Sequence, residues 1–215
     1  ATVTDIVLYY RHIGDADLFG RFVFLAFVLM LGYEAAFYAV DTIEKGRKAK
    51  VYEELAIHDV LTGLYNRNAY MEDMSQMKSA RGKMFVSFDL NNLKECNDGH
   101  GHVEGDTYLR NAARIIEKIF DPYGKVYRIG GDEFCCIVEH AARCPILFCI
   151  EGMRTEEEKY NSNPEHYPIH IACGYAQFDP ERDESFEGTR NRSDVSMYEN
   201  KSNIKQKMHI EDSRR

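Results

Sequence analysis

The chain has 215 residues, of which 27 are basic and 35 acidic, so its formal net charge is −8. An acidic surface does not neutralise phosphates, which argues against a nonspecific DNA or RNA binder. Apolar residues make up 44%, with only 15 glycines and 5 prolines, which excludes a disordered or collagen-like chain. We expect one ordinary folded domain and an additional segment.

The cysteines lie in the middle and C-terminal parts of the chain and form no C-x-x-C pair. They are Cys96, Cys135, Cys136, Cys144, Cys149 and Cys173. Such scattered cysteines are typical of buried, reduced thiols in a reducing compartment. The spacing does not favour a zinc site.

An uncharged run, FVFLAFVLMLGY, extends from Phe22 to Tyr33, and only Glu34 interrupts it before Val40. A helix of this length approaches the roughly 30 Å thickness of a hydrocarbon core. We predict an N-terminal segment, 1–40, with a transmembrane helix over about residues 18–40; the alternative is a buried helix of a soluble sensor. Because the chain begins at Ala1, this helix can be the last span of a larger sensor, and Glu34 favours packing beside other spans.

Basic residues follow the apolar run at Lys45, Arg47, Lys48 and Lys50. The positive-inside rule then predicts an inner (cytoplasmic) membrane protein with its C-terminal part in the cytoplasm. Residues 41–57 are charged and helix-favouring. They predict a linker or signalling helix that pairs with a second copy, or alternatively a solvated linker.

The remaining residues, 58–215, alternate between helical and strand patterns. Helices are expected over 68–79, 102–120, 142–161 and 193–207, and strands over 83–90, 126–129, 134–138 and 169–178. This order predicts an α/β domain whose sheet is of mixed direction and carries helices on its faces.

Three carboxylates are expected at one end of this sheet. Gly130-Gly131-Asp132-Glu133 separates two strands as a hairpin tip, where glycines allow positive φ angles. Asp89 ends a buried strand, where a carboxylate is costly unless it is paired or bound to metal. Three carboxylates together suit Mg²⁺, which commonly serves phosphates. The alternative for the hairpin is a solvated acidic turn.

Polar residues nearby have the chemistry to bind a nucleotide. Asn97 and Asp106 offer an amide and a carboxylate to a guanine edge, although both residue types also form turns and caps. The stretch before the 102–120 helix can offer backbone N–H groups to phosphate. Lys201 and Lys205, spaced i, i+4, can clamp a triphosphate, or form a solvated cationic face.

Five motifs, in order over roughly residues 55–207, resemble those of the GGDEF domains, the diguanylate cyclases. RIGGDEF at 128–134 resembles the family signature. The other four motifs are DVLTGLYNR at 59–67, the segment 89–106, ACGYA at 172–176 and DVSMYENK at 194–201. The N-terminal segment is also similar to the last span and linker of multi-span sensors that carry this domain.

The resemblance implies a palm-like α/β fold related to nucleotidyl cyclases, with a central mixed sheet flanked by helices. It implies a diguanylate cyclase, in which each domain of a homodimer binds one GTP and two GTP condense to cyclic di-GMP and two pyrophosphates. The implied cofactor is Mg²⁺, or Mn²⁺ in its place, with two ions per active site. The alternative is a GTP-binding regulatory or dimerisation module without turnover.

The resemblance also assigns roles by position. Asp89, Asp132 and Glu133 would be the catalytic acids and, together with the Leu90 carbonyl, the metal ligands. Asn97 and Asp106 would read guanine. The phosphate-binding residues would be Asn92, Leu93, Lys94, Lys201 and Lys205.

Two positions depart from the family pattern. Asp121–Gly124 stands where many members have an R-x-x-D site that binds product, so we expect no product inhibition through this site. Lys205 stands where the family often has arginine. Lysine keeps the charge but loses bidentate phosphate geometry.

Overall fold

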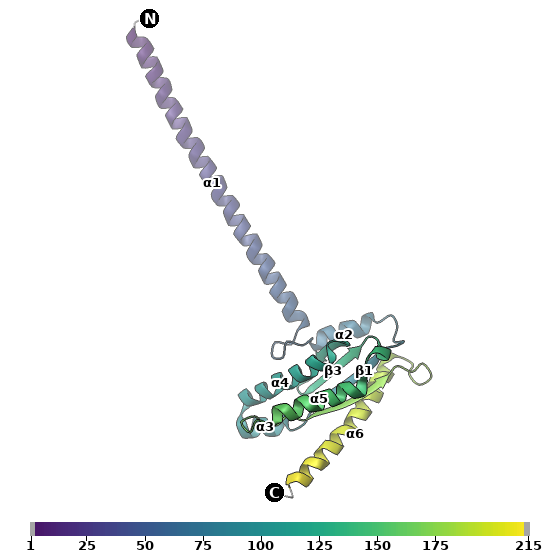
Figure 1. Cartoon of the computed structure of the whole chain (residues 1–215). Coiled ribbons are helices and arrows are strands. Elements are labelled where there is room, and N and C mark those ends of the chain that lie inside the picture. The colour runs from purple at the N-terminus through teal and green to yellow at the C-terminus, as the bar shows by residue number, and fades with distance from the viewer. Residues whose placement is uncertain (1–2, 213–215) are drawn as a thin grey trace. The chain divides into compact units, whose positions relative to one another are not determined.

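The computed structural model describes residues 3–212, except for the side chains at 5–6, 9–10, 12–19, 21, 48–53, 55 and 207–212, so Lys48 and Lys50 of the predicted basic cluster lie outside the described side chains. The helices are α1 (Val3–Ile57), α2 (Arg67–Gln76), α3 (Leu93–His100), α4 (His102–Phe120), α5 (Ile146–Asn161) and α6 (Phe186–Asp212). The strands are β1 (Met84–Leu90), β2 (Gly124–Arg128), β3 (Glu133–Val138) and β4 (Ile171–Gln177) (Figure 1).

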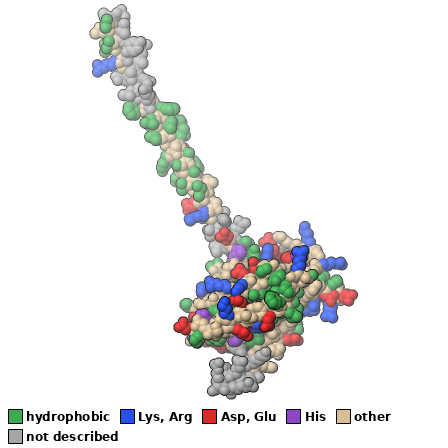
Figure 2. Space-filling model, viewed as in Figure 1, with side chains coloured by type: hydrophobic (Ala, Val, Ile, Leu, Met, Phe, Trp, Pro, Cys, Tyr) green, Lys and Arg blue, Asp and Glu red, His purple; other side chains and the backbone are tan. Residues whose placement is uncertain are grey.

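Helix α1 is a continuous helix of 55 residues. Its segment Phe22–Arg47 reaches a mean hydropathy of 1.9 with none of its most apolar window buried, so by length and composition it can cross a membrane. Figure 2 shows hydrophobic side chains gathered along this stretch. The chain divides into two compact units, one up to Glu53 and one from Glu54 onwards.

The four-stranded sheet has the order β2-β3-β1-β4, and every neighbouring pair of these strands is antiparallel. The predicted mixed direction is therefore wrong for the described strands. The helical crossovers do join parallel strands, β1 to β2 and β3 to β4, but another strand lies between the members of each pair. Parallel pairing is confined to an isolated bridge between Tyr65 and Tyr127 in the part of the chain described.

Strand β1 is buried along its whole length because both faces of the sheet are covered. Val86 and Phe88 pack into the cluster formed with α4 and α5, whereas Phe85 packs with α2 and α6. Side chains alternate along a strand, so Asp89 shares the face of Phe85 and points to the α6 side.

Helix α6 lies directly on β4. A Cβ atom on Gly174 would come within 2.1 Å of the Met197 backbone nitrogen, so only glycine permits this approach. The six cysteines are all free and buried, as the sequence predicts.

Candidate functional site

The three predicted acids lie where β1 ends and β3 begins. Asp89 and Glu133 are directly opposite each other in the antiparallel register. The Leu90 N–H donates to the Asp132 carbonyl oxygen at 3.1 Å, which fixes the hairpin beside the end of β1. The sheet thus brings together residues more than forty positions apart in the sequence.

Asp89 is only 7% exposed, and its Oδ1 lies 2.5 Å from Lys201 Nζ. Burial raises the pKa of Asp89, and the hydrogen bond and charge of Lys201 offset this only in part. Among the described residues, the Lys201 amine is the close partner of Asp89 Oδ1, whereas the buried Asn91 Oδ1 has no hydrogen-bond partner. Buried carboxylate and amide oxygens of this kind are the hard donors that a cation such as Mg²⁺ accepts.

The acids do not form a ready-made metal cluster. Within the described residues, no group of three or more His, Cys, Asp or Glu side chains is arranged to hold a metal ion. The amine of Lys201 contacts the oxygen that a cation would use. A metal ion that binds this oxygen would therefore have to displace the Lys201 amine or share the Asp89 carboxylate with it.

The hairpin glycines serve a purpose other than the one predicted. Neither Gly130 nor Gly131 has a positive φ, so the turn does not depend on that conformation. A Cβ atom on Gly130 would lie 2.7 Å from Glu133 Oε2, and the Ile129 N–H donates to the Glu133 carbonyl oxygen at 3.0 Å. Glycine here leaves room for the Glu133 carboxylate.

Arg128 joins the hairpin to the first motif, a link that sequence reasoning missed although both partners lie inside the motifs. Its Nη2 donates to the Gly131 carbonyl oxygen at 2.8 Å, and its Nη1 donates to Asp59 Oδ1 at 3.0 Å. Burial alone would raise the pKa of Asp59, but hydrogen bonds from Thr62 and Arg128 outweigh it and leave this pKa lowered. The charged pair holds the hairpin against the turn that follows α1.

Three of the five predicted phosphate-binding residues, Asn92, Leu93 and Lys94, lie at the start of α3, a helix that the sequence patterns did not indicate, and the other two, Lys201 and Lys205, lie on α6. Asn92 precedes the helix with φ 64°, and its side chain does not cap the helix. The first-turn N–H groups at Leu93 and Lys94 therefore lack a side-chain cap, which suits an anion. The Lys94 side chain is exposed.

The two predicted guanine-reading residues lie on α3 and α4. A Cβ atom on Gly105 would lie 1.9 Å from Asn97 Oδ1, so the Asn97 amide rests on the backbone of α4 at the residue before Asp106. The Asp106 side chain is 49% exposed, and Arg110 Nη2 lies 3.8 Å from its carboxylate. The packing of α3 on α4 thus fixes the Asn97 amide, while the Asp106 carboxylate remains accessible.

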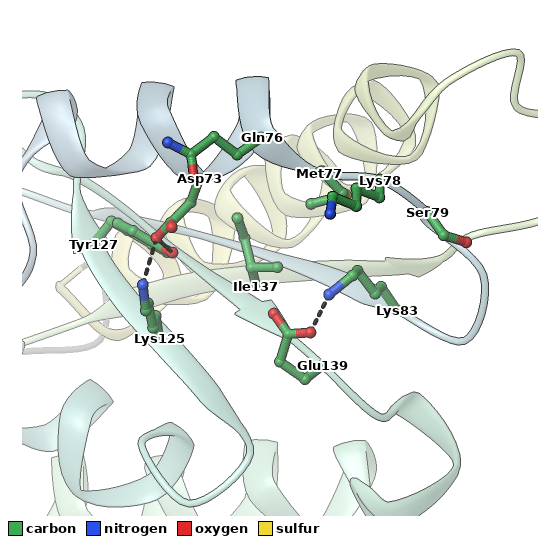
Figure 3. A pocket seen from close by; sticks show the side chains of 10 residues that line it. All are labelled: Asp73, Gln76, Met77, Lys78, Ser79, Lys83, Lys125, Tyr127, Ile137 and Glu139. Atoms are coloured by element: carbon green, nitrogen blue, oxygen red, sulfur yellow. Dashed lines mark hydrogen bonds and ion pairs between the residues drawn. The ribbon is translucent and has the colours of Figure 1, made fainter.

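Two cavities differ in their relation to this centre. A cavity of about 550 Å³ has Glu133 on its wall, with Arg190, Asp194 and Tyr198 from α6. Another, of about 310 Å³, includes none of the predicted site residues; there Lys125 pairs with Asp73, and Lys83 with Glu139 (Figure 3). In each pair the positive charge of the lysine is neutralised by the carboxylate. We therefore assign this cavity no role.

The fold and the site define a class, an antiparallel α/β domain with an acid–lysine centre at one end of its sheet. The family described as "Diguanylate cyclase, GGDEF domain" matches residues 56–207, so the chain belongs to the GGDEF family.

Curated relatives named diguanylate cyclases agree with this family assignment. The chain is 31% identical to diguanylate cyclase DgcZ of Escherichia coli over 151 residues, which cover 66% of this chain and 49% of DgcZ. It is 28% identical to diguanylate cyclase DgcS of Shewanella oneidensis over 162 residues, or 71% of this chain and 53% of DgcS. It is 33% identical to diguanylate cyclase VdcA of Vibrio cholerae over 116 residues, or 54% of this chain and 34% of VdcA. The chain thus spans at most about half the length of these relatives.

Solved structures confirm the fold. The GGDEF domain of DgcB from Caulobacter crescentus in complex with c-di-GMP has a TM-score of 0.60 and 27% identity, covering 69% of this chain and 91% of that one. The DgcB structure that includes the coiled coil has a TM-score of 0.66 at 22% identity, with 80% and 95% covered, which shows the fold alone.

Proposed function

We propose that the chain is a diguanylate cyclase. The observation that carries this proposal is that Asp89, Asp132 and Glu133 lie near one another where β1 ends and β3 begins, with Asp89 in contact with Lys201. The 3′-hydroxyl of each GTP would attack the α-phosphate of the other, so that two P–O bonds form, two break, and two pyrophosphates leave with cyclic di-GMP as product. The relatives named diguanylate cyclases support the assignment.

The acids would hold the cofactor. Asp89, Asp132, Glu133 and the Leu90 carbonyl are the proposed ligands of Mg²⁺, with Mn²⁺ as a substitute and two ions per site. The burial of the Asp89 carboxylate, which is paired with a single amine, supports the fit. When bound, the metal would supply positive charge to the phosphates and stabilise the charge that develops there.

The chain's own residues would bind and orient the nucleotide. Asn97 and Asp106 would receive the guanine edge. Asn92, Leu93 and Lys94 at the start of α3, with Lys201 and Lys205 on α6, would hold the triphosphate. Because each domain would hold one GTP, turnover needs a homodimer; we further propose that α1 attaches the chain to the cytoplasmic membrane.

The test is to incubate the purified full chain with GTP and Mg²⁺ and identify products by mass spectrometry. The chain should form cyclic di-GMP, and Asp132→Ala should abolish it without lowering the unfolding temperature. Asp121→Ala, which removes an exposed acid outside the site, should leave the rate unchanged. Bound GTP without product at any protein concentration would instead indicate a GTP-binding regulatory module.

A further inference from the structure

Strand β4 is an edge strand whose outward backbone groups are covered by side chains rather than by another strand. The Ile171 N–H donates to Glu157 Oε1 at 3.2 Å, and Arg154 Nη1 donates to the Ile171 carbonyl oxygen at 2.8 Å. The Cys173 N–H donates to Asn200 Oδ1 at 3.0 Å. Side chains from α5 and α6 thus satisfy the edge, whose polar groups would otherwise be costly to bury.

Asn200 links the two helices that cover this edge. Its Oδ1 accepts a second hydrogen bond, from Arg154 Nη2 at 3.1 Å. Arg154 is itself held by the buried carboxylate of Glu157, with Nη1 2.9 Å from Oε2. Asn200 is therefore held by α5 and by β4 at once, through one oxygen atom.

The residue after Asn200 is Lys201, whose amine contacts Asp89. The four-carbon stem of a lysine has a limited reach, so the amine of Lys201 can contact Asp89 only while the turn of α6 that carries it stays close to β1. Lys205, one turn further along α6, is exposed. Asn200, which anchors α6, is thus adjacent to Lys201, the lysine that contacts the predicted metal ligand Asp89.

We infer that Asn200 is a positioning residue for Lys201: by tying α6 to Arg154 and to the edge of β4, it fixes the turn that presents the Lys201 amine to Asp89 and to a bound triphosphate. The inference rests on the proposed function. It assigns Asn200 an effect on nucleotide affinity that acts through Lys201, without contact between Asn200 and the nucleotide.

The test measures the dissociation constant of 3′-deoxy-GTP with Mg²⁺, because this nucleotide lacks the attacking hydroxyl and cannot react. In the full chain, Asn200→Ala should weaken binding about fivefold, the value of one to two lost hydrogen bonds. Asn200→Asp keeps an acceptor for both donors and should stay within about twofold of wild type. Asn203→Ala, the same change at an exposed position of α6, should have no effect.

The deciding comparison is made in a Lys201→Ala background, as a double-mutant cycle. If Asn200 acts through Lys201, Asn200→Ala should cause no further loss there. An equal loss in both backgrounds would show a merely structural role and overturn the inference, as would no loss in the wild-type background. Binding of 3′-deoxy-GTP without product from GTP would refute the proposed cyclase activity but not the role of Asn200. A chain that does not bind 3′-deoxy-GTP would overturn both the proposed activity and the role of Asn200.

Discussion

Asp89 and Lys201 form a partly buried ion pair, with side chains 10% and 23% exposed. Removing one partner of such a pair leaves a desolvated charge behind. We expect Lys201→Ala to lower the free energy of unfolding in EDTA by roughly 1–3 kcal/mol, less than for a fully buried pair. If Asp89 is a metal ligand, Mg²⁺ should then stabilise the variant more than the wild type, because the cation replaces the lost amine.

Denaturant titrations of both proteins, with EDTA and with Mg²⁺, would measure this difference. Lys205→Ala, which removes an exposed lysine of the same helix, is the matched control for stability. Equal responses of wild type and Lys201→Ala to Mg²⁺ would contradict the metal assignment of Asp89.

Glu157 is a buried acid whose ionisation opposes folding. Burial raises its pKa to about 7, although Arg154 and the Ile171 N–H favour the charged form. The native state therefore binds more protons than the unfolded state between pH 4.5, the ordinary pKa of glutamate, and about pH 7, and stability falls as the pH rises through this window. Glu157→Gln stays neutral and should lack this loss, gaining roughly 1–3 kcal/mol relative to wild type across the window.

Urea unfolding of wild type and Glu157→Gln at pH 5, 6 and 7.5 would check the sign. The charge of the neighbouring Glu158 also raises the pKa of Glu157, whereas the charge of Arg154 lowers it. Both charges therefore contribute to the pKa that this experiment probes. A difference between the two proteins that does not change with pH would show that Glu157 is charged throughout.

Between elements, the contact of α3 with α4 depends on the missing side chain of Gly105. A methyl group there would overlap Asn97 Oδ1 and displace the amide from its place on α4. We expect Gly105→Ala to reduce the preference for GTP over ATP by roughly tenfold, since a base-reading hydrogen bond is lost. Gly99 in α3 has open space where a Cβ atom would lie, so Gly99→Ala should keep the preference for GTP over ATP.

The ratio of kcat/KM for the two nucleotides, or of their dissociation constants, measures this effect. An unchanged ratio in Gly105→Ala would show that Asn97 does not read the base.

The elements differ in how well the sequence predicted them. Helix α4 has the predicted bounds, 102–120, because its apolar stripe repeats strongly at helical spacing. Helix α3 was missed because it is only eight residues long and contains Asn97, Asp98 and Gly99, which are weak helix formers. Its buried Cys96 packs into the main core, so tertiary contacts stabilise a helix that local propensity does not favour.

In the candidate site, too, the sequence predicts some features and tertiary packing sets the others. The acids and lysines are visible in the sequence because motif spacing marks them. The contacts of Lys201 with Asp89, and of Asn200 with Arg154, join residues from different elements. No local pattern encodes which rotamers meet, so these contacts form only when α6 is packed against β1 and α5.

At the scale of the whole molecule, the candidate span in α1 and the GGDEF domain belong to separate compact units. The predicted pairing of residues 41–57 remains a prediction, because the structure describes a single chain. A homodimer of the domains would need either strong association of the domains themselves or a high local concentration.

That dependence leads to a prediction about activity and concentration. A reaction that joins two GTP molecules held by two domains should have a rate per chain that rises with protein concentration until the dimer is saturated. If α1 spans a membrane, lipid vesicles should raise the local concentration and increase the rate above that in detergent at the same bulk concentration. Diluting the chain with additional lipid, at constant protein, should reverse the gain. A rate per chain that stays constant down to concentrations at which sedimentation shows the chain to be monomeric would mean that one domain suffices, and the dimeric mechanism would have to be abandoned.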